Sequence, residues 1–355
     1  MKYLLLLLTL SARVAPLCAQ EAPDQFPEPG AKEENYTMKI TARVIDEDGN
    51  PLPDAPIRVS IHNVNDYKDM YNDFRGKTDA EGKFSAEGIG RGLAKIEVKK
   101  EGCYPSRKTV TCYEGTAEQI RETGKFLPWN PIVDIMVKEI GKPIPMLVRR
   151  GNRCRSRIKP EPEQIGKKLG WDLVEGDWVA PIGNGKVADL VVVFETTYKD
   201  ESNRTASVQI GFGNKEDGCI PLLELKGEES LLKFPRNAPK EGYDVRKLEY
   251  SLQYKEVEEP RNYMNKTLTQ LPNPLPEGYL LRLRTQKDKD GKVVSAIYGK
   301  ITSPFGLKDI LFRGNRRLFL NFDYYLNPTP NDRNLEYDQK SNLAPEADKD
   351  LRWPP

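Results

Sequence analysis

The sequence TMKITARVIDEDGNPLPDAPIRVSI occupies residues 37–61 and contains two segments in which apolar and polar residues alternate. Such alternation predicts half-buried strands, because successive side chains of a strand point to opposite faces of its sheet. The apolar positions are Met38, Ile40, Ala42 and Val44 in the first segment and Ile57, Val59 and Ile61 in the second. Between the segments, Asp48-Gly49 supplies a turn in which positive φ is readily adopted. We therefore expect two consecutive strands here.

The same pattern continues on the C-terminal side of this stretch. A second turn is predicted at Glu81-Gly82, directly before Phe84. Further alternating positions are Ala94, Ile96 and Val98, then Val110 and Cys112, then Val133, Ile135 and Val137. About seven short strands with frequent turns in roughly 100 residues are typical of a β-sandwich.

Three motifs in this region carry a resemblance to a known family. Residues 48–57, DGNPLPDAPI, resemble the opening of carboxypeptidase-regulatory-like domains, and residues 78–84, TDAEGKF, resemble their Thr-Asp…Gly…Phe turn. Residues 92–98 and 101–104 resemble their later Gly…Val and Gly-Tyr segments, except that Cys103 is inserted before Tyr104. The resemblance covers residues 37–139. It implies a seven-stranded transthyretin-like (prealbumin-like) sandwich that acts as an accessory or structural module of exported proteins.

A second β-rich, sandwich-like domain is predicted over residues 141–327, after the Pro-rich sequence at 142–145. Alternating strands recur through this region, and Asp290-Gly291 predicts a hairpin turn. One short helix is expected from Pro162 to Leu169, with proline early and Gly170 at its end. Residues 328–355 are rich in Pro, Asn and charge and are expected to form an extended or disordered tail.

The N-terminus predicts export. Lys2 precedes an apolar region formed by Leu4 to Leu8 with Leu10, and cleavage is expected after Ala19. This region is shorter than the ~20 residues that span a bilayer, so residues 1–19 fit a secretory signal peptide and 20–36 a flexible leader. Lipidation at Cys18 is the alternative, although Leu17 is large for that signal. We expect a bacterial protein that is periplasmic or secreted, without a transmembrane segment.

Charge and length restrict the function classes. Residues 1–19 contain two basic and no acidic residues, so the 55 basic and 53 acidic residues of the chain become 53 and 53 after cleavage. Nucleic-acid binding depends on an excess of Lys and Arg, so a neutral chain argues against a nucleic-acid partner. A chain of 355 residues is long enough for two domains with separate cores.

Four cysteines remain after the expected cleavage: Cys103, Cys112, Cys154 and Cys219. An even number in an exported chain predicts two disulfides, and three connectivities are possible. We favour Cys103–Cys112 with Cys154–Cys219. The alternative is that some of these cysteines are buried thiols.

His62 is the one histidine of the chain, and alternation places it on the solvent side of its strand. A carboxypeptidase-type zinc site needs two histidines with a glutamate, and a serine triad needs a histidine base. We therefore predict no metal, no cofactor and no conventional catalytic residues. The sequences at Asp46–Gly49 and Asp288–Gly291 are superficially similar to calcium loops, but hairpin turns account for both.

Carboxylates are the remaining acid–base candidates, and they define the rival hypothesis of a hydrolase in the second domain. They lie near two tryptophans and are Asp172, Glu175, Asp177, Asp189 and Glu195. Glycosidases need two carboxyl groups about 5–9.5 Å apart. Asp189 and Glu195 share one strand face but are separated by about 20 Å at ~3.3 Å per residue, so they cannot act together.

Two residue sets are candidate ligand-binding groups. Guanidinium groups match phosphate and carboxylate, which suggests an anionic glycan or headgroup at Arg149, Arg150 and Arg153. Flat aromatic faces suit sugar rings, which suggests stacking on Trp171, Trp178, Tyr324 and Tyr325. The alternatives are a solvated connector for the arginines and core packing for the rings. The sequence therefore predicts a non-catalytic envelope protein that binds a glycan or another envelope protein, or has a structural role.

Overall fold

The computed structural model describes residues 36–63, 71–150, 157–200, 203–225, 227, 229–254, 267–270, 275–312 and 315–344. All of them belong to one compact unit, Tyr36–Pro355. The expected signal peptide and almost all of the leader lie outside the described residues, as do Arg153 and Cys154.

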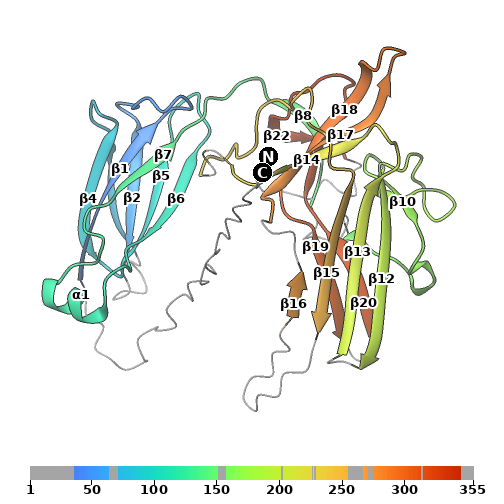
Figure 1. Ribbon diagram of the computed structural model, residues 1–355. Coiled ribbons are helices and arrows are strands. Elements are labelled where there is room, and N and C mark those ends of the chain that lie inside the picture. Colours follow the sequence, from blue (N-terminus) through green and yellow to red (C-terminus); the bar gives the residue numbers. More distant parts are fainter. Residues whose placement is uncertain are drawn as a thin grey trace, which may run out of the picture. The chain divides into compact units, whose positions relative to one another are not determined.

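The predicted N-terminal sandwich is confirmed, with seven strands in two sheets (Figure 1). One sheet has the order β4 (Lys83–Gly90), β1 (Tyr36–Ile45), β7 (Ile132–Met136), with β1 antiparallel to β4 and parallel to β7. The other is antiparallel, with the order β3 (Tyr71–Lys77), β2 (Pro56–His62), β5 (Leu93–Val98), β6 (Ser106–Thr111). The alternating apolar residues of β1, β2 and β5 are buried between the two sheets in a single cluster.

The predicted turns form at the expected glycines. Gly49, Gly82 and Gly291 have φ of 87°, 70° and 80°, the region that favours glycine. In the first and third of these turns, the carboxylates of Asp46 and Asp288 accept backbone N–H groups two and four residues further on. These acids therefore act in turn formation.

The chain from residue 144 onward is also mainly β, as predicted. One sheet has the order β11 (Asp177–Trp178), β10 (Leu169–Asp172), β12 (Leu190–Asp200), β13 (Asn203–Phe212), β15 (Lys247–Tyr254), β16 (Thr267–Gln270). A second has the order β14 (Gly218–Leu222), β17 (Gly278–Lys287), β18 (Val293–Ile301), β21 (Tyr324–Asn327), β8 (Ile144–Arg149), β22 (Tyr337–Asn342). A smaller sheet has the order β19 (Gly306–Phe312), β20 (Asn315–Asn321), β9 (Arg157–Ile158).

The two six-stranded sheets share one large apolar core, to which β12 and β13 contribute from one sheet and β17 and β21 from the other. The opposite face of the β17 sheet is covered as well, by a second cluster that contains Phe234, Tyr243 and Leu335. Residues 278–283 of β17 are consequently all buried. Because this sheet is covered on both faces, its strands lack the polar alternation of a half-exposed sheet.

The prediction of a helix over residues 162–169 is wrong. The structure has only a three-residue 3₁₀ helix, η2 (Pro162–Gln164), after which Ile165 is extended and Gly166 has a φ of 80°. Leu169 already belongs to β10, whose pairing with β12 outweighs the local helical signal. A real helix, α1 (Ala117–Thr123), was not predicted, although Thr116 and Gln119 form a capping box and Gly124 ends it. No helix among the described residues is long and apolar enough to cross a membrane.

The segment after Asn327 is ordered against the sheet as far as residue 344. It is extended, and β22 pairs in parallel with β8. Leu335 and Glu336 are buried, and the Glu336 carboxylate accepts the N–H groups of Gly141 and Lys142. Residues 345–355 of the expected tail lie outside the described part. The domain limits at 139, 141 and 327 remain predictions.

Candidate functional site

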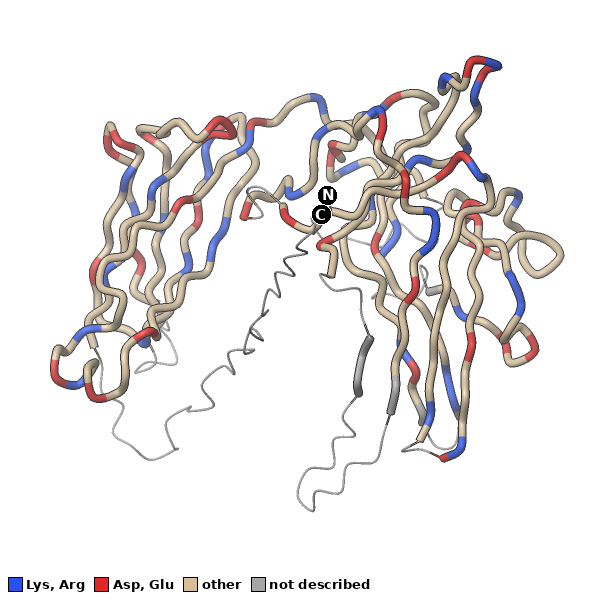
Figure 2. Tube along the Cα trace, viewed as in Figure 1, with Lys and Arg blue, Asp and Glu red and all other residues tan. Residues whose placement is uncertain are grey.

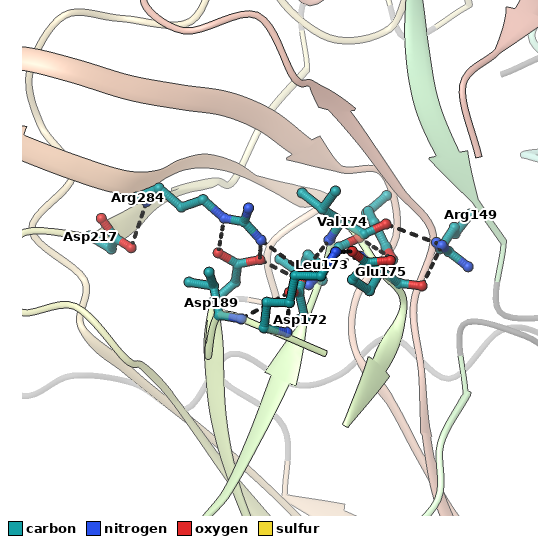
Figure 3. A network of polar contacts seen from close by, with 11 residues as sticks. Arg149, Asp172, Leu173, Val174, Glu175, Asp189, Asp217 and Arg284 are labelled. Atoms are coloured by element: carbon teal, nitrogen blue, oxygen red, sulfur yellow. Dashed lines mark hydrogen bonds and ion pairs between the residues drawn. The ribbon is translucent and has the colours of Figure 1, made fainter. Parts of the chain in front are cut away.

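The turn between β10 and β11 is the centre of a polar network in the second β-rich region (Figure 3). Asp172, at the end of β10, accepts the N–H groups of Val174 and Glu175 with one carboxylate oxygen at 2.9 and 3.0 Å. Its other oxygen accepts those of Lys186 and Val187 at 2.9 and 3.0 Å. A single buried carboxylate therefore holds two separate loop segments.

Arg284 connects this carboxylate to a second one. Its Nη2 donates to Asp172 at 2.8 Å and to Asp189 at 2.9 Å, and its Nε donates to Asp189 at 2.9 Å. The side chains of both acids are buried, with 1% and 0% exposure, whereas that of Arg284 is 29% exposed. Charge-assisted bonds with this forked geometry are the strong kind, so Arg284 ties β17 to β10 and to the start of β12.

A bulge in β17 directs Arg284 toward these acids. The register shifts between Leu283 and Gln286, and Arg284 has a φ of 53°, which is unusual for a residue other than glycine. The ladder N–H groups that the bulge frees are accepted by the carboxylate of Asp217, from Arg284 at 2.9 Å and from Thr285 at 2.8 Å. Asp217 therefore stabilises the backbone conformation on which the Arg284 contacts depend.

Two residues from the same sheet as β17 hold the carbonyl groups of the turn. Arg149, at the end of β8, donates to the carbonyl oxygens of Val174 and Glu175 at 3.2 and 2.7 Å. The hydroxyl of Tyr324 in β21 donates to the carbonyl of Leu173 at 2.7 Å. The Leu173 N–H donates to Asp189 at 2.9 Å. Arg149 and Tyr324 of one sheet thus hold the C=O groups of a turn of the other sheet, while the N–H groups of the turn are held by Asp172 and Asp189, the two acids that Arg284 contacts.

The two acids on Arg284 have opposite pKa shifts. Burial acts to raise the pKa of Asp172, but its backbone N–H donors and Arg284 outweigh burial and the pKa is lowered. Burial raises the pKa of Asp189, against the opposing effect of Arg284. The hydrogen bond and charge of Asp189 raise the pKa of Arg284, which keeps the guanidinium charged.

This arrangement is suited to holding the two sheets together. A glycosidase needs an acid and a base that face each other across a space for substrate. Here the guanidinium of Arg284 lies between Asp172 and Asp189 and donates to both. The other carboxylates of the rival hypothesis are also in turns or on the surface: Asp177 accepts the N–H groups of Trp178 and Asn184, Glu175 pairs with Lys186 at 2.6 Å, and Glu195 is exposed.

The four aromatic residues predicted to stack on sugars are core residues, which corrects that expectation. Trp171 and Trp178 are 5% and 8% exposed and pack edge to face, with ring centroids 5.1 Å apart. Tyr324 and Tyr325 are 0% and 1% exposed and belong to different apolar clusters. As adjacent strand residues they point to opposite faces of a sheet that is covered on both faces, so they cannot form one platform.

Two of the three arginines predicted to bind anions, Arg149 and Arg150, contact other parts of the protein. Arg149 is 3% exposed and holds the β10–β11 turn, as described above. Arg150 donates to the hydroxyl of Tyr325 at 2.9 Å. Arg153 lies outside the described residues. The solvated-connector interpretation is therefore wrong for Arg149, because its partners are backbone carbonyls on a turn 25 residues away.

The favoured disulfide Cys103–Cys112 is wrong. Both cysteines are unpaired, and so is Cys219. Cys103 precedes β6 and Cys112 follows it, so the six residues of this strand alone separate them by about 20 Å, whereas bridged cysteines have Cα atoms about 4.4–6.8 Å apart. Cys112 and Cys219 are buried in apolar clusters, and burial raises the pKa of each thiol, that of Cys219 to about 12.

His62 ends β2 and is half-buried. Its ring lies 5.2 Å from that of Tyr71, centroid to centroid, on the neighbouring strand β3. The His62 ring therefore contacts another aromatic ring. Among the described residues, no group of three or more His, Cys, Asp or Glu is arranged to hold a metal ion.

Lys300 is a buried cation that the sequence interpretation missed. Lys300 in β18 is 3% exposed, and its ammonium lies 5.0 Å from the ring centroid of Tyr325 and 5.7 Å from that of Phe234. Burial lowers its pKa from 10.5 to about 8. A lysine of this pKa is a possible nucleophile in an accessible site, but this one is enclosed by aromatic side chains.

Substituting Lys300 with methionine should stabilise the protein at neutral pH. The folded state binds this proton less tightly than the unfolded state, so charged Lys300 opposes folding below pH 8. We expect Lys300→Met to raise the free energy of unfolding by about 1–3 kcal/mol at pH 7. The difference should shrink as the pH rises from about 8 to 10.5, because native Lys300 is then neutral. Urea titrations of both proteins at several pH values measure this; a pH-independent difference would contradict it.

Gly176, at the end of the β10–β11 turn, should not tolerate a side chain. Its φ is 69°, and a Cβ here would overlap the guanidinium of Arg149. Gly176→Ala is expected to lower the free energy of unfolding by about 2 kcal/mol or more, from backbone strain and displaced Arg149. Gly291→Ala is the control, since its φ is 80° but a Cβ there meets open space. If chemical denaturation showed the same loss of unfolding free energy in both variants, the side chain at position 176 would not displace Arg149.

Comparison with known proteins adds distant structural likenesses. No protein-family model matches the chain, and no curated protein matches it. The solved structures that match include 3-chlorocatechol 1,2-dioxygenase from Rhodococcus opacus 1CP, with 12% identity and a TM-score of 0.23 over 31% of this chain and 63% of that one. The chain therefore spans less than two thirds of that enzyme.

Two pilins also match, over more of this chain. A streptococcal ancillary pilin has 9% identity and a TM-score of 0.20, over 74% of this chain and 62% of its own. The major pilin subunit BcpA of Bacillus cereus has 11% identity and a TM-score of 0.21, over 80% of this chain and 95% of its own. Likenesses of this size establish neither a family nor a function for the chain.

Proposed function

We propose that this chain is a non-catalytic, exported protein of the bacterial cell envelope, with a binding or structural accessory role toward a glycan or an envelope protein. The proposal includes removal of residues 1–19, a sandwich module of the carboxypeptidase-regulatory-like type at 37–139, and a second β-rich domain at 141–327. The motifs at 48–57 and 78–84 support the module, and the apolar region formed by Leu4 to Leu8 with Leu10 supports export.

One observation carries the non-catalytic part of this proposal. The buried acids and arginines of the second region use their polar atoms on one another and on the backbone, in the network around Arg284. Groups engaged in this way hold a fold together, whereas a general acid or base must reach a proton of the substrate.

The rival function is a hydrolase that uses paired carboxylates, and one observation favours it. The pKa values of Asp172 and Asp189 are shifted in opposite directions, as is common for an acid and a base with divided roles. Their shared contact with Arg284 argues against it, because the guanidinium occupies the place of a substrate.

A two-part experiment separates these functions. Mature protein is assayed on polysaccharides and esters, and it is also immobilised and exposed to envelope extracts. We expect retention of an envelope component and no turnover. Turnover that is lost in Asp189→Asn or Asp177→Asn would establish the hydrolase, whereas failure to retain any component would refute the binding role. Mass spectrometry of the exported protein should show Gln20 as its first residue.

A further inference from the structure

The two sheets of the N-terminal sandwich have outer faces of different charge. On the β4-β1-β7 sheet, two of the three outward cations are each paired with one acid, Lys39 with Glu87 at 3.0 Å and Arg43 with Asp134 at 2.6 Å, and Lys83 is the third. On the β3-β2-β5-β6 sheet, the strand registers place five cations on the outer face, and Lys99, directly after β5, pairs with Glu97 of that face. Together these six residues form what we call the basic face: Arg58, Arg75, Lys77, Lys95, Lys99 and Arg107. Figure 2 shows blue Lys and Arg positions along these strands.

The acids of the basic face are shared between cations and do not neutralise it. Among the described residues of these strands, the outward positions carry two acids, Asp73 and Glu97. Asp73 pairs with Arg58 at 2.7 Å and with Arg75 at 3.5 Å. Glu97 pairs with Arg107 at 2.8 Å and with Lys99 at 3.2 Å. An excess of positive charge therefore remains on an ordered surface.

The cations on this face remain available to an outside partner. The side chains of Arg75 and Arg107 are each 71% exposed, and that of Lys99 is 61% exposed. Arg75 and Arg107 lie on the two outer strands of the four-stranded sheet, β3 and β6, and Lys99 directly follows β5. Neighbouring strands of a sheet are spaced by about 4.8 Å. Guanidinium groups bind carboxylates through paired N–H donors, so such a flat array suits a chain that carries repeated carboxylates.

From this geometry we propose that the basic face binds an acidic polysaccharide, that is, a linear glycan with carboxylates on its sugar rings. The inference rests on the proposed envelope-binding function and names its partner class. None of the exposed large apolar side chains among the described residues lies on these four strands, and a membrane surface usually takes up such residues. In the part of this face that the structure describes, there is also no protruding helix or ribbon for a DNA groove.

His62 and Tyr71 lie at one end of this face and make it unsuited to base stacking. Lys95 donates to the Tyr71 hydroxyl at 2.7 Å and lies 4.8 Å from its ring centroid, while His62 contacts the same ring. Sheets that bind single-stranded nucleic acid present open aromatic rings to the bases. Here the ring is occupied by its neighbours, which favours recognition through charge.

Binding of sodium alginate, a carboxylated polysaccharide, tests the proposal with the full mature chain. We expect the protein to bind alginate but not neutral dextran, with an affinity that falls as salt is raised. Arg75→Glu with Arg107→Glu should weaken alginate binding at least ~10-fold. Lys39→Glu with Lys83→Glu, on the opposite sheet, changes the net charge equally and should leave binding within ~2-fold.

Several outcomes would overturn the proposal. Equal losses in the two double variants would show a general charge effect, and tighter binding to single-stranded DNA or to anionic phospholipid vesicles would assign the face to another partner. If the glutamate variants do not fold, the glutamine variants at positions 75 and 107 serve instead, with an expected loss of at least ~3-fold. Retention of an envelope component without alginate binding would reject this inference and leave the proposed function in place.

Discussion

Substitution of Arg284 with methionine is expected to lower the free energy of unfolding by about 3–5 kcal/mol, because it leaves two buried carboxylates without their cation. Asp172 and Asp189 are 1% and 0% exposed in their side chains, and both accept hydrogen bonds from Arg284. Methionine is about as long as the aliphatic part of arginine and so retains the packing of that part. Urea denaturation of the mature protein, followed by tryptophan fluorescence, measures the change.

A matched control separates burial from simple loss of an ion pair. Arg43→Met removes an arginine that also forms two bonds to one aspartate, Asp134, at 2.6 and 2.7 Å. That pair is exposed, with 43% and 44% exposure of its side chains, so water replaces the lost partner. The denaturation midpoint of Arg43→Met should therefore stay close to that of the unmodified protein.

A second variant tests the charge explanation directly. If the stability loss comes from unpaired charge, adding Asp189→Asn to Arg284→Met should recover part of it, although the asparagine amide cannot replace every bond. The two changes should then be strongly non-additive. A loss in Arg284→Met as small as that in Arg43→Met would show that the network around Arg284 does not hold the two sheets together.

The strands were predictable from sequence because their signal is local. Alternation such as that of Met38, Ile40, Ala42 and Val44 has a physical cause within the strand itself, since one face is buried and the other is not. The glycine turns were predictable for the same reason. The failed helix at 162–169 shows the limit, because pairing of Leu169 with Val192 outweighs the local propensity.

The polar network was not predictable because its partners are remote. Arg284 is 95 residues from Asp189 and 112 residues from Asp172, and the bulge that aims it leaves no clear local pattern. A weaker signal was present: Arg282 interrupts, and Arg284 directly follows, the apolar stretch 279–283 of a strand that is buried on both faces. Arginines in such a strand require buried partners, so they could have been identified as network residues.

The aromatic residues illustrate the same limit, and Trp171 gives the second prediction of large effect. Its ring belongs to the core shared by the two six-stranded sheets and is 5% exposed. Trp171→Ala should therefore lower the free energy of unfolding by about 3–5 kcal/mol, through lost burial and a cavity. Tyr113→Ala is the exposed control, because Tyr113 is 54% exposed. This variant should lose much less unfolding free energy than Trp171→Ala.

Trp171→Phe distinguishes packing from polar contacts at this position. The indole Nε1 of Trp171 is buried and has no hydrogen-bond partner among the described residues, so replacing it removes an unsatisfied donor. The smaller phenyl ring loses some packing, and the two effects oppose each other. Trp171→Phe should lower the free energy of unfolding by less than about 1.5 kcal/mol, which is well below the loss expected for Trp171→Ala. If Trp171→Ala left stability unchanged but abolished glycan binding, the ring would be a binding residue after all, and the core assignment would be wrong.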